Sequence, residues 1–292
     1  MFKSSHSLAS HLVGPSGEFC EQMRVLGVRQ VISTTSKRGS FNGEPYTLLL
    51  LGSAHGTING LLWHTRFGDR PTHFGVGDVV EFEGLIAYDS PTPYLNISEF
   101  EWIDPANMTF AALFPLDWTP LEQKGWLKNL EVGWSALTDD DIRCFLAETF
   151  LPTQVAQGLL NSPASVKHHH KERGGLLWHV SEMVSEYIPQ QTLSNIDSDV
   201  AFALKLTHDL GKIVTMRGNS ISPRGRFQPH EIAALELISD PLKSLAARNP
   251  EAANLIRGYF APRSWFPHQN SEIYRLVVQH DRASAGMGGC RG

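Results

Sequence analysis

The sequence lacks the features that organise disulfide-rich, zinc-knuckle or membrane proteins. Its 292 residues include three cysteines. Cys20, Cys144 and Cys290 are odd in number, far apart and without a CxxC spacing, which argues against a disulfide framework or a zinc knuckle. No run of about 18 consecutive apolar residues occurs, and the opening MFKSSHSLASHLVGPSG lacks the continuous apolar core of a signal peptide. We therefore expect a cytoplasmic protein that does not associate with a membrane.

A strongly basic balance is also missing. The formal net charge is −5, whereas proteins that coat duplex nucleic acid by bulk electrostatics usually contain a strongly basic domain. The charge is uneven along the chain. Residues 1–167 hold 11 Lys and Arg against 18 Asp and Glu, a net of −7, and residues 168–292 hold 14 against 12, a net of +2. The second half is therefore the expected location of an anionic substrate.

Residues 20–105 have the pattern of β-strands. The segments VLGVRQVIST, PYTLLLLGS, TINGLLWH, DVVEFEGLIAY and YLNISEFEWI are rich in β-branched residues, alternate in polarity and are bounded by turn residues. Five strands in about 80 residues suit a small closed barrel, and the OB-fold is the commonest such barrel that binds polymers. An SH3-like barrel is the alternative. The segment SFNGEPYTLLLL, followed by GTINGLLW, resembles the first hairpin of nucleic-acid-binding OB domains.

The remaining sequence predicts a linker and then an all-α domain. The stretch DPANMTFAALFPLDWTP favours irregular structure, and we place the linker at residues 106–134. From Ser135 the periodicity is helical, and the three aspartates after Thr138 suit a helix N-terminus. Further helices are predicted for GLLWHVSEMVSEYI, DVAFALKLTHDLGK, HEIAALELI and SEIYRLVVQHDRAS. The predicted fold is thus α+β multidomain, with a five-stranded OB-like barrel before an all-α domain at residues 135–292.

The helical half contains a candidate metal site. The dipeptide His-Asp occurs twice, and chance gives roughly 0.6 occurrences at this composition, so the context must decide. His208 and Asp209 end an apolar helix ahead of Leu-Gly-Lys, which places two adjacent ligands and a cation at one helix terminus. His179 and Asp281 each lie within an apolar helix and are the candidates to complete the set. We therefore predict that His179, His208, Asp209 and Asp281 bind a divalent metal.

This set of ligands indicates phosphoester hydrolysis. Mixed imidazole and carboxylate ligands suit Mn²⁺, Fe²⁺, Co²⁺, Ni²⁺ or Zn²⁺ better than Ca²⁺ and leave positions for water and substrate. Such an ion polarises a phosphoryl oxygen and lowers the pKa of a bound water. Lys212, four residues after His208, is the candidate to neutralise phosphate charge in the transition state. His230 is the candidate proton donor to the leaving oxygen, or a ligand of a second metal.

Basic residues beside these positions are candidates for substrate binding. Arg217, Arg224 and Arg226 lie in the loop before His230 and are suited to backbone phosphates. The consecutive histidines at residues 168–170 fit a solvated loop, a substrate contact, a metal ligand or a partner of a ligand equally well, so we leave them outside the metal set.

The barrel offers its own candidates for nucleic-acid contact. Lys37 and Arg38 lie in a hairpin-like loop and could reach phosphates. Five aromatic residues of the strands could stack on bases, although we expect most of them in the core: Tyr46, Trp63, Phe82, Tyr88 and Tyr94. Spacing alone does not choose among these rings.

The motifs in the helical half resemble those of a known family. HHHKERGGLLWH, LTHDLGK, PHEIAALELI and VVQHDRAS resemble the successive motifs of the HD superfamily of metal-dependent phosphohydrolases, in the order that the family shows. With an OB-like domain in front, the architecture is similar to the YhaM-type 3′→5′ exoribonucleases. That resemblance implies an exonuclease of the Mn²⁺ type that acts on single-stranded RNA or DNA. The segment SPASVKHHHKERGGLLWH also resembles the HD module of MobH-type, TraI-like conjugative relaxases.

The sequence departs from the HD pattern in two places, and it is compatible with two other functions. After His230 the sequence IRGYFAPRSWFPHQN offers only His268, where many two-metal HD proteins provide another histidine or a pair, so a one-metal and a two-metal site both stay open. The sequence also ends soon after Asp281, where the exoribonucleases continue with further helices.

One alternative function is an HD nucleotidase or cyclic-nucleotide phosphodiesterase. The other is a DNA-processing module of the relaxase type. The sequence does not choose between RNA and DNA or fix an oligomeric state.

Overall fold

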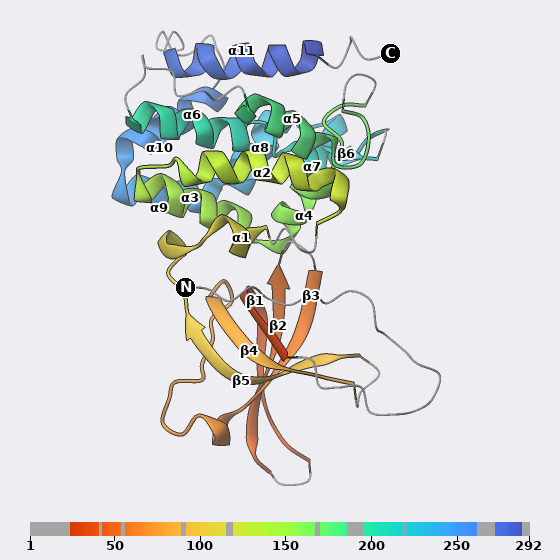
Figure 1. Ribbon diagram of the computed structural model, residues 1–292, viewed down its shortest axis with the longest axis vertical. Coiled ribbons are helices and arrows are strands. Elements are labelled where there is room, and N and C mark those ends of the chain that lie inside the picture. The colour runs from red at the N-terminus through yellow and green to blue at the C-terminus, as the bar shows by residue number, and fades with distance from the viewer. Residues whose placement is uncertain are drawn as a thin grey trace. The chain divides into compact units, whose positions relative to one another are not determined.

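The computed structural model describes residues 24–40, 43–53, 56–88, 92–114, 119–166, 170–185, 195–218, 220–261 and 272–287. The chain divides into two compact units, Met1–Asp104 and Pro105–Gly292 (Figure 1). None of the described helices has both the length and the apolar character needed to cross a bilayer.

The first unit is a closed five-stranded barrel. Its strands run in the order β1-β2-β3-β5-β4, and β4 pairs with β1 to close the barrel. All neighbouring strands are antiparallel except β3 and β5. The strands are β1 (Arg24–Arg38), β2 (Pro45–Ser53), β3 (Gly56–Trp63), β4 (Val79–Ala87) and β5 (Tyr94–Trp102). The predicted OB-like barrel is therefore confirmed.

Alternation along the strands explains which side chains fill the barrel. Successive residues of a strand point to opposite faces, and in β2 this places Thr47, Leu49 and Leu51 inside, each at most 1% exposed. Gly84 lies at an irregularity between β4 and β5. A Cβ at Gly84 would lie 2.3 Å from the carbonyl oxygen of Asn96, so the two strands approach closely only because this residue is glycine.

The second unit is helical (Figure 1). Its helices pack on one another, and a two-stranded hairpin of β6 (Met216–Arg217) and β7 (Ser220–Ile221) interrupts them. The longer elements are α2 (Leu121–Ser135), α3 (Asp140–Phe150), α4 (Thr153–Asn161), α5 (Gly175–Ser185), α6 (Asn195–Thr207), α8 (His230–Leu237), α9 (Ser239–Arg248), α10 (Pro250–Phe260) and α11 (Glu272–Met287). The short ones are η2 (Pro105–Asn107), α1 (Phe110–Leu113), α7 (Lys212–Thr215) and η4 (Arg224–Arg226). The first unit also has the short η1 (His64–Arg66).

The linker expected at residues 106–134 is not what the structure shows there. This segment contains α1 and most of α2, and α2 packs against α5 within the helical unit. The physical reason is an apolar stripe in α2, where Leu127, Leu130 and Trp134 are buried. These residues recur at helical spacing, but the Pro, Asp and Trp that precede them dominate the local composition.

The start of α3 agrees with the sequence prediction and links two helices. The side chain of Asp139 accepts a hydrogen bond from the backbone N–H of Ile142 at 2.9 Å, which caps the helix. Asp199 of α6, only 2% exposed, accepts from the backbone N–H groups of Thr138 and Asp139 and from the Thr138 hydroxyl. This buried carboxylate therefore ties α6 to the first turn of α3, and α6 leads directly to His208.

Candidate metal centre

The structure brings all four predicted ligands together. His179 lies in α5, His208 and Asp209 follow the last residue of α6, and Asp281 lies in α11. The helices α5, α6 and α11 pack on one another. Each of the four residues offers one ligand atom, and these atoms lie within 4.8 Å of one another.

The distances between these atoms match those around a single ion. His179 Nε2 lies 3.4 Å from His208 Nε2, 3.5 Å from Asp209 Oδ2 and 3.3 Å from Asp281 Oδ1. His208 Nε2 lies 3.4 Å and 3.8 Å from the same two carboxylate oxygens. Two ligand atoms at about 2.1 Å from one ion are about 3.4 Å apart in tetrahedral geometry. The four residues therefore fit a divalent cation with only small shifts.

Hydrogen bonds orient the histidine at the end of α6. His208 Nδ1 lies 3.1 Å from the carbonyl oxygen of Lys205, which can only accept, so Nδ1 carries the hydrogen. The other ring nitrogen, Nε2, then directs its lone pair toward His179 and the carboxylates when the ring is neutral. When both rings are neutral and carry their hydrogen on Nδ1, two imidazole nitrogens and two carboxylate oxygens converge without a donor among the four, and such a set suits a cation.

The electrostatics of the site follow from burial and mutual charge. Burial by itself lowers the pKa of His208, but the charges and hydrogen bonds of Asp209 and Asp281 outweigh it and raise this pKa to about 9. Burial favours neutral Asp209, yet His208 and Lys212 hold the pKa of this carboxyl well below its usual value. The pKa of Asp281 is also lowered, because its interactions with the rings of His179 and His208 outweigh its burial. Without a metal, the site therefore retains a proton on His208 and two ionised carboxylates.

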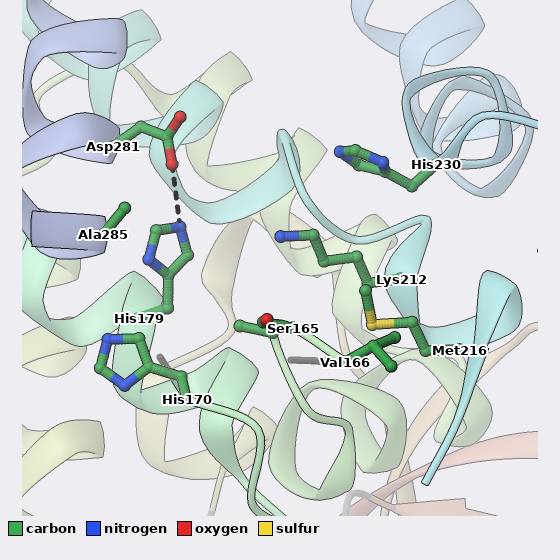
Figure 2. A pocket seen from close by; sticks show the side chains of 10 residues that line it. Ser165, Val166, His170, His179, Lys212, Met216, His230, Asp281 and Ala285 are labelled. Carbon is green, nitrogen blue, oxygen red and sulfur yellow. Dashed lines mark ion pairs between the residues drawn. The ribbon is translucent and has the colours of Figure 1, made fainter. Parts of the chain in front are cut away.

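Lys212 and His230 meet Asp209 from the opposite side. The ammonium group of Lys212 forms an ion pair with Asp209 Oδ2, and His230 Nε2 lies 3.1 Å from Asp209 Oδ1. Figure 2 shows a pocket with two walls, with His179 and Asp281 on one and Lys212 and His230 on the other. The pocket encloses about 490 Å³, with Met216, Ser165 and Val166 among its lining residues. Both residues predicted for catalysis thus face the space beside the four ligands.

The three predicted substrate arginines occupy different environments. Arg224 forms an ion pair with Glu236 and donates to the Gln228 side chain. Arg217 and Arg226 are exposed and form no ion pair with any described residue. None of the three lines the pocket. Their loop is held against α7, because Ser222 donates its hydroxyl hydrogen to the Val214 carbonyl at 2.7 Å.

The site includes residues that the sequence analysis left open or missed. Two of the three consecutive histidines, His168 and His169, lie outside the described residues. His170 is buried and lines the pocket. Ser284 lies 2.9 Å from His179 Nδ1 through its hydroxyl oxygen, although no sequence signal singled it out.

The barrel candidates are also distributed between core and surface. Phe82 is 1% exposed and belongs to the core, whereas Tyr88 is 46% exposed. The rings of Tyr46 and Trp63 lie 5.0 Å apart on paired positions of β2 and β3. Lys37 is exposed opposite Tyr46 on β1. One row across three strands therefore combines a cation with two aromatic rings.

Comparisons with known proteins add evidence from whole sequences. The chain is similar to YhaM exoribonucleases. It is 27% identical over 272 residues to the 3′-5′ exoribonuclease YhaM of Shouchella clausii, which covers 86% of this chain and 79% of that protein. It is 24% identical over 270 residues to YhaM of Bacillus subtilis, with 86% and 81% covered. It is 21% identical over 222 residues to YhaM of Listeria welshimeri, with 74% and 68% covered. No model of a protein family matches the chain.

Proposed function

We propose that this protein is a metal-dependent phosphodiesterase of the HD type that degrades single-stranded RNA from its 3′ end. The observation that carries the proposal is the convergence of His179, His208, Asp209 and Asp281 beside a pocket whose far wall holds a lysine and a histidine. The likeness to proteins named 3′-5′ exoribonuclease YhaM, over most of both chains, supports the same activity.

The four ligands are suited to Mn²⁺, with Fe²⁺, Co²⁺, Ni²⁺ or Zn²⁺ as alternatives. When bound, such an ion supplies Lewis acidity toward a phosphoryl oxygen and lowers the pKa of water at the site. The side chains of His179 and His208 would hold it through Nε2, and Asp209 and Asp281 through one carboxylate oxygen each. Asp209 Oδ2 faces the two histidines and Lys212, and the other oxygen, Oδ1, already lies 3.1 Å from His230 Nε2, so a single ion is the simplest occupancy.

The wall of the pocket that holds Lys212 and His230, called the far wall, supplies the remaining chemistry. The Lys212 side chain is 15% exposed, and its ammonium group is placed to neutralise charge on the phosphate as it develops. The His230 side chain is more accessible, at 35%, and its Nε2 lies 3.1 Å from Asp209 Oδ1. A protonated His230 can donate to the departing ribose oxygen. The two residues therefore divide charge neutralisation and proton donation between them.

Residues that adjoin the pocket residues Met216 and His230 in the sequence favour a polymeric substrate. Phe227 is 90% exposed, and it follows the exposed Arg226 and precedes His230 by three residues. Single-stranded nucleic acids bind where aromatic rings stack on bases and cations meet phosphates. We assign this role to Phe227, Arg217 and Arg226, whereas Arg224 supports the loop through Glu236. In the barrel, Tyr46 and Trp63 with Lys37 have the same combination of groups.

A nucleotidase or cyclic-nucleotide phosphodiesterase is the second candidate. A pocket of about 490 Å³ is large enough for one nucleotide. In that case the barrel would serve another purpose, such as regulation or assembly.

The deciding experiment follows the degradation of 5′-labelled single-stranded RNA and DNA of one sequence in Mn²⁺. Our proposal expects a ladder that shortens from the 3′ end on RNA and no cleavage of circular RNA. Turnover of mononucleotides or cyclic nucleotides with both polymers intact would select the second candidate. Equal degradation of DNA would keep the mechanism and correct the substrate.

Metal affinity is expected to depend on pH through His208. The ion needs the neutral ring, and the pKa of about 9 means that a proton competes for Nε2 at neutral pH. Raising the pH from about 6.5 to 8.5 should therefore tighten Mn²⁺ binding by about tenfold per unit. The metal-free protein should show the opposite trend and lose stability as the pH rises from 6.5 through about 9, because folding raises this pKa.

Calorimetry in two buffers of different ionisation enthalpy tests this prediction. Below the pKa of His208, each ion bound should release about one proton. The His208→Gln variant should bind more weakly and with a flatter pH dependence. Affinity that is independent of pH in the parent protein would contradict the assignment of His208 as a ligand.

A further inference from the structure

Two facing helices each provide a metal ligand and, one turn later, a residue of one hydrogen-bond network that ends on His179. His179 and Glu182 are three residues apart in α5, and Asp281 and Ser284 are three residues apart in α11. Side chains at this spacing lie on the same face of a helix. The first members converge on the metal centre, and the second members contact each other, since Ser284 Oγ lies 2.7 Å from Glu182 Oε2.

The direction of these hydrogen bonds fixes the tautomer of His179. The Ser284 hydroxyl has one hydrogen, and a carboxylate can only accept it, so the hydroxyl donates to Glu182. Its oxygen therefore accepts from His179 Nδ1 at 2.9 Å, which places the ring hydrogen on Nδ1. His179 Nε2 is then left with its lone pair toward the candidate metal position.

The same carboxylate oxygen also holds His170. His170 Nε2 lies 3.1 Å from Glu182 Oε2, and its ring packs edge-on against Trp178 at 4.5 Å. His170 is the one non-glycine residue with positive φ, +58°, in the described part of the chain. L side chains rarely adopt this conformation, and it persists where the surroundings impose it. Gly175 is part of those surroundings, because a Cβ there would lie 2.0 Å from the His170 carbonyl oxygen.

We propose that Glu182 and His170 are positioning residues of the metal centre, which act on His179 through Ser284. The proposal rests on the metal site of the proposed function. His170 donates to Glu182 and fixes its carboxylate, Glu182 fixes the Ser284 hydroxyl, and Ser284 fixes the His179 ring. Figure 2 shows His170 beside His179 on the wall opposite Lys212 and His230. A ligand that contacts His170 in the pocket would therefore also affect the geometry of His179.

The same hydrogen bonds could serve only to join α5 to α11. The test must therefore separate this structural role from the positioning of a metal ligand. Glu148 provides a matched control, because it also accepts a serine hydroxyl from another helix, that of Ser244 at 3.0 Å. Glu148 does not line the pocket. Glu182→Gln and Glu148→Gln thus make the same chemical change to similar contacts. Only Glu182 is connected through Ser284 to a metal ligand, His179.

The primary readout is affinity for Zn²⁺ and Mn²⁺, measured by competition with a fluorescent chelator. We expect Glu182→Gln and Ser284→Ala to weaken it about 10- to 100-fold, and Glu148→Gln to leave it within about twofold of the parent protein. His170→Gln keeps an N–H donor and should retain affinity that His170→Ala loses. Equal affinities in the parent protein, Glu182→Gln and Ser284→Ala would overturn the proposal, as would an equal loss in Glu148→Gln.

A second readout needs no variant. Long-range ¹H–¹⁵N correlation spectra of the zinc-loaded protein should show the His179 hydrogen on Nδ1, and a hydrogen on Nε2 would overturn the proposal. If the parent protein binds neither metal, the proposed function fails together with this inference. If it binds metal and the variants bind equally well, only the positioning role fails.

Discussion

The Asp209→Ala variant is expected to lose metal-dependent hydrolysis by about 10³-fold, which corresponds to about 4 kcal/mol of transition-state stabilisation. Asp209 lies between the two walls of the pocket. Asp209 lies near His179 and His208 through Oδ2 and near His230 through Oδ1, and it pairs with Lys212. Its removal therefore takes away a ligand and also releases the lysine and the histidine of the far wall.

The measurement is the initial rate on labelled single-stranded RNA, together with the content of bound metal. Asp240→Ala is the control, since Asp240 is exposed and its ion pair with Lys243 is a surface contact. The control should retain the rate of the parent protein. Asp209→Asn should retain the shape of the site while weakening metal binding, because an amide is a poorer ligand. An Asp209→Ala protein that keeps more than a tenth of the parent rate would remove Asp209 from the mechanism.

The barrel could be predicted because its signal is local. Alternation in PYTLLLLGS assigns Leu49 and Leu51 to the interior without knowledge of any other strand, and the structure agrees. Turn residues between such segments then limit the number of strands. The strand order needed the structure, because the parallel pairing of β3 with β5 joins segments that sequence periodicity treats independently.

The four ligands could be predicted because each carries its own context. His208 and Asp209 adjoin at the end of an apolar helix, and His179 and Asp281 each lie within an apolar helix. Ser284 has no such context. It is 105 residues from His179 in the sequence, and only the packing of α5 on α11 makes them neighbours. A serine in a helix is ordinary until its partner is known.

The arginine loop marks another limit of sequence reasoning. Composition treats Arg217, Arg224 and Arg226 alike, as cations near a phosphoesterase motif. The structure separates them, because the η4 turn and the start of α8 bring Arg224 to Glu236, twelve residues away. Which charges are neutralised inside the protein depends on turn geometry, and composition does not record that geometry.

The substitution Gly211→Ala is expected to destabilise the helical unit by roughly 3 kcal/mol and to reduce hydrolysis more than tenfold. Gly211 has φ −59°, so the backbone conformation does not require glycine. The space does. A Cβ there would lie 1.8 Å from the carbonyl oxygen of His230 and 2.7 Å from the backbone nitrogen of Ala234. To accommodate it, α8 must move away from α7, and that movement takes His230 away from Asp209.

A second glycine substitution separates this steric effect from the general effect of alanine in helices. Gly125 is exposed within α2, and a Cβ there has no described atom within 4 Å. Gly125→Ala should therefore stabilise the protein by about 0.5–1 kcal/mol, because alanine costs less conformational entropy in a helix. Urea unfolding followed by the helical circular dichroism signal measures both changes. If Gly211→Ala also stabilised the protein and kept the rate, α8 would be free to shift without loss, and His230 would then act from a mobile position rather than from its contact with Asp209.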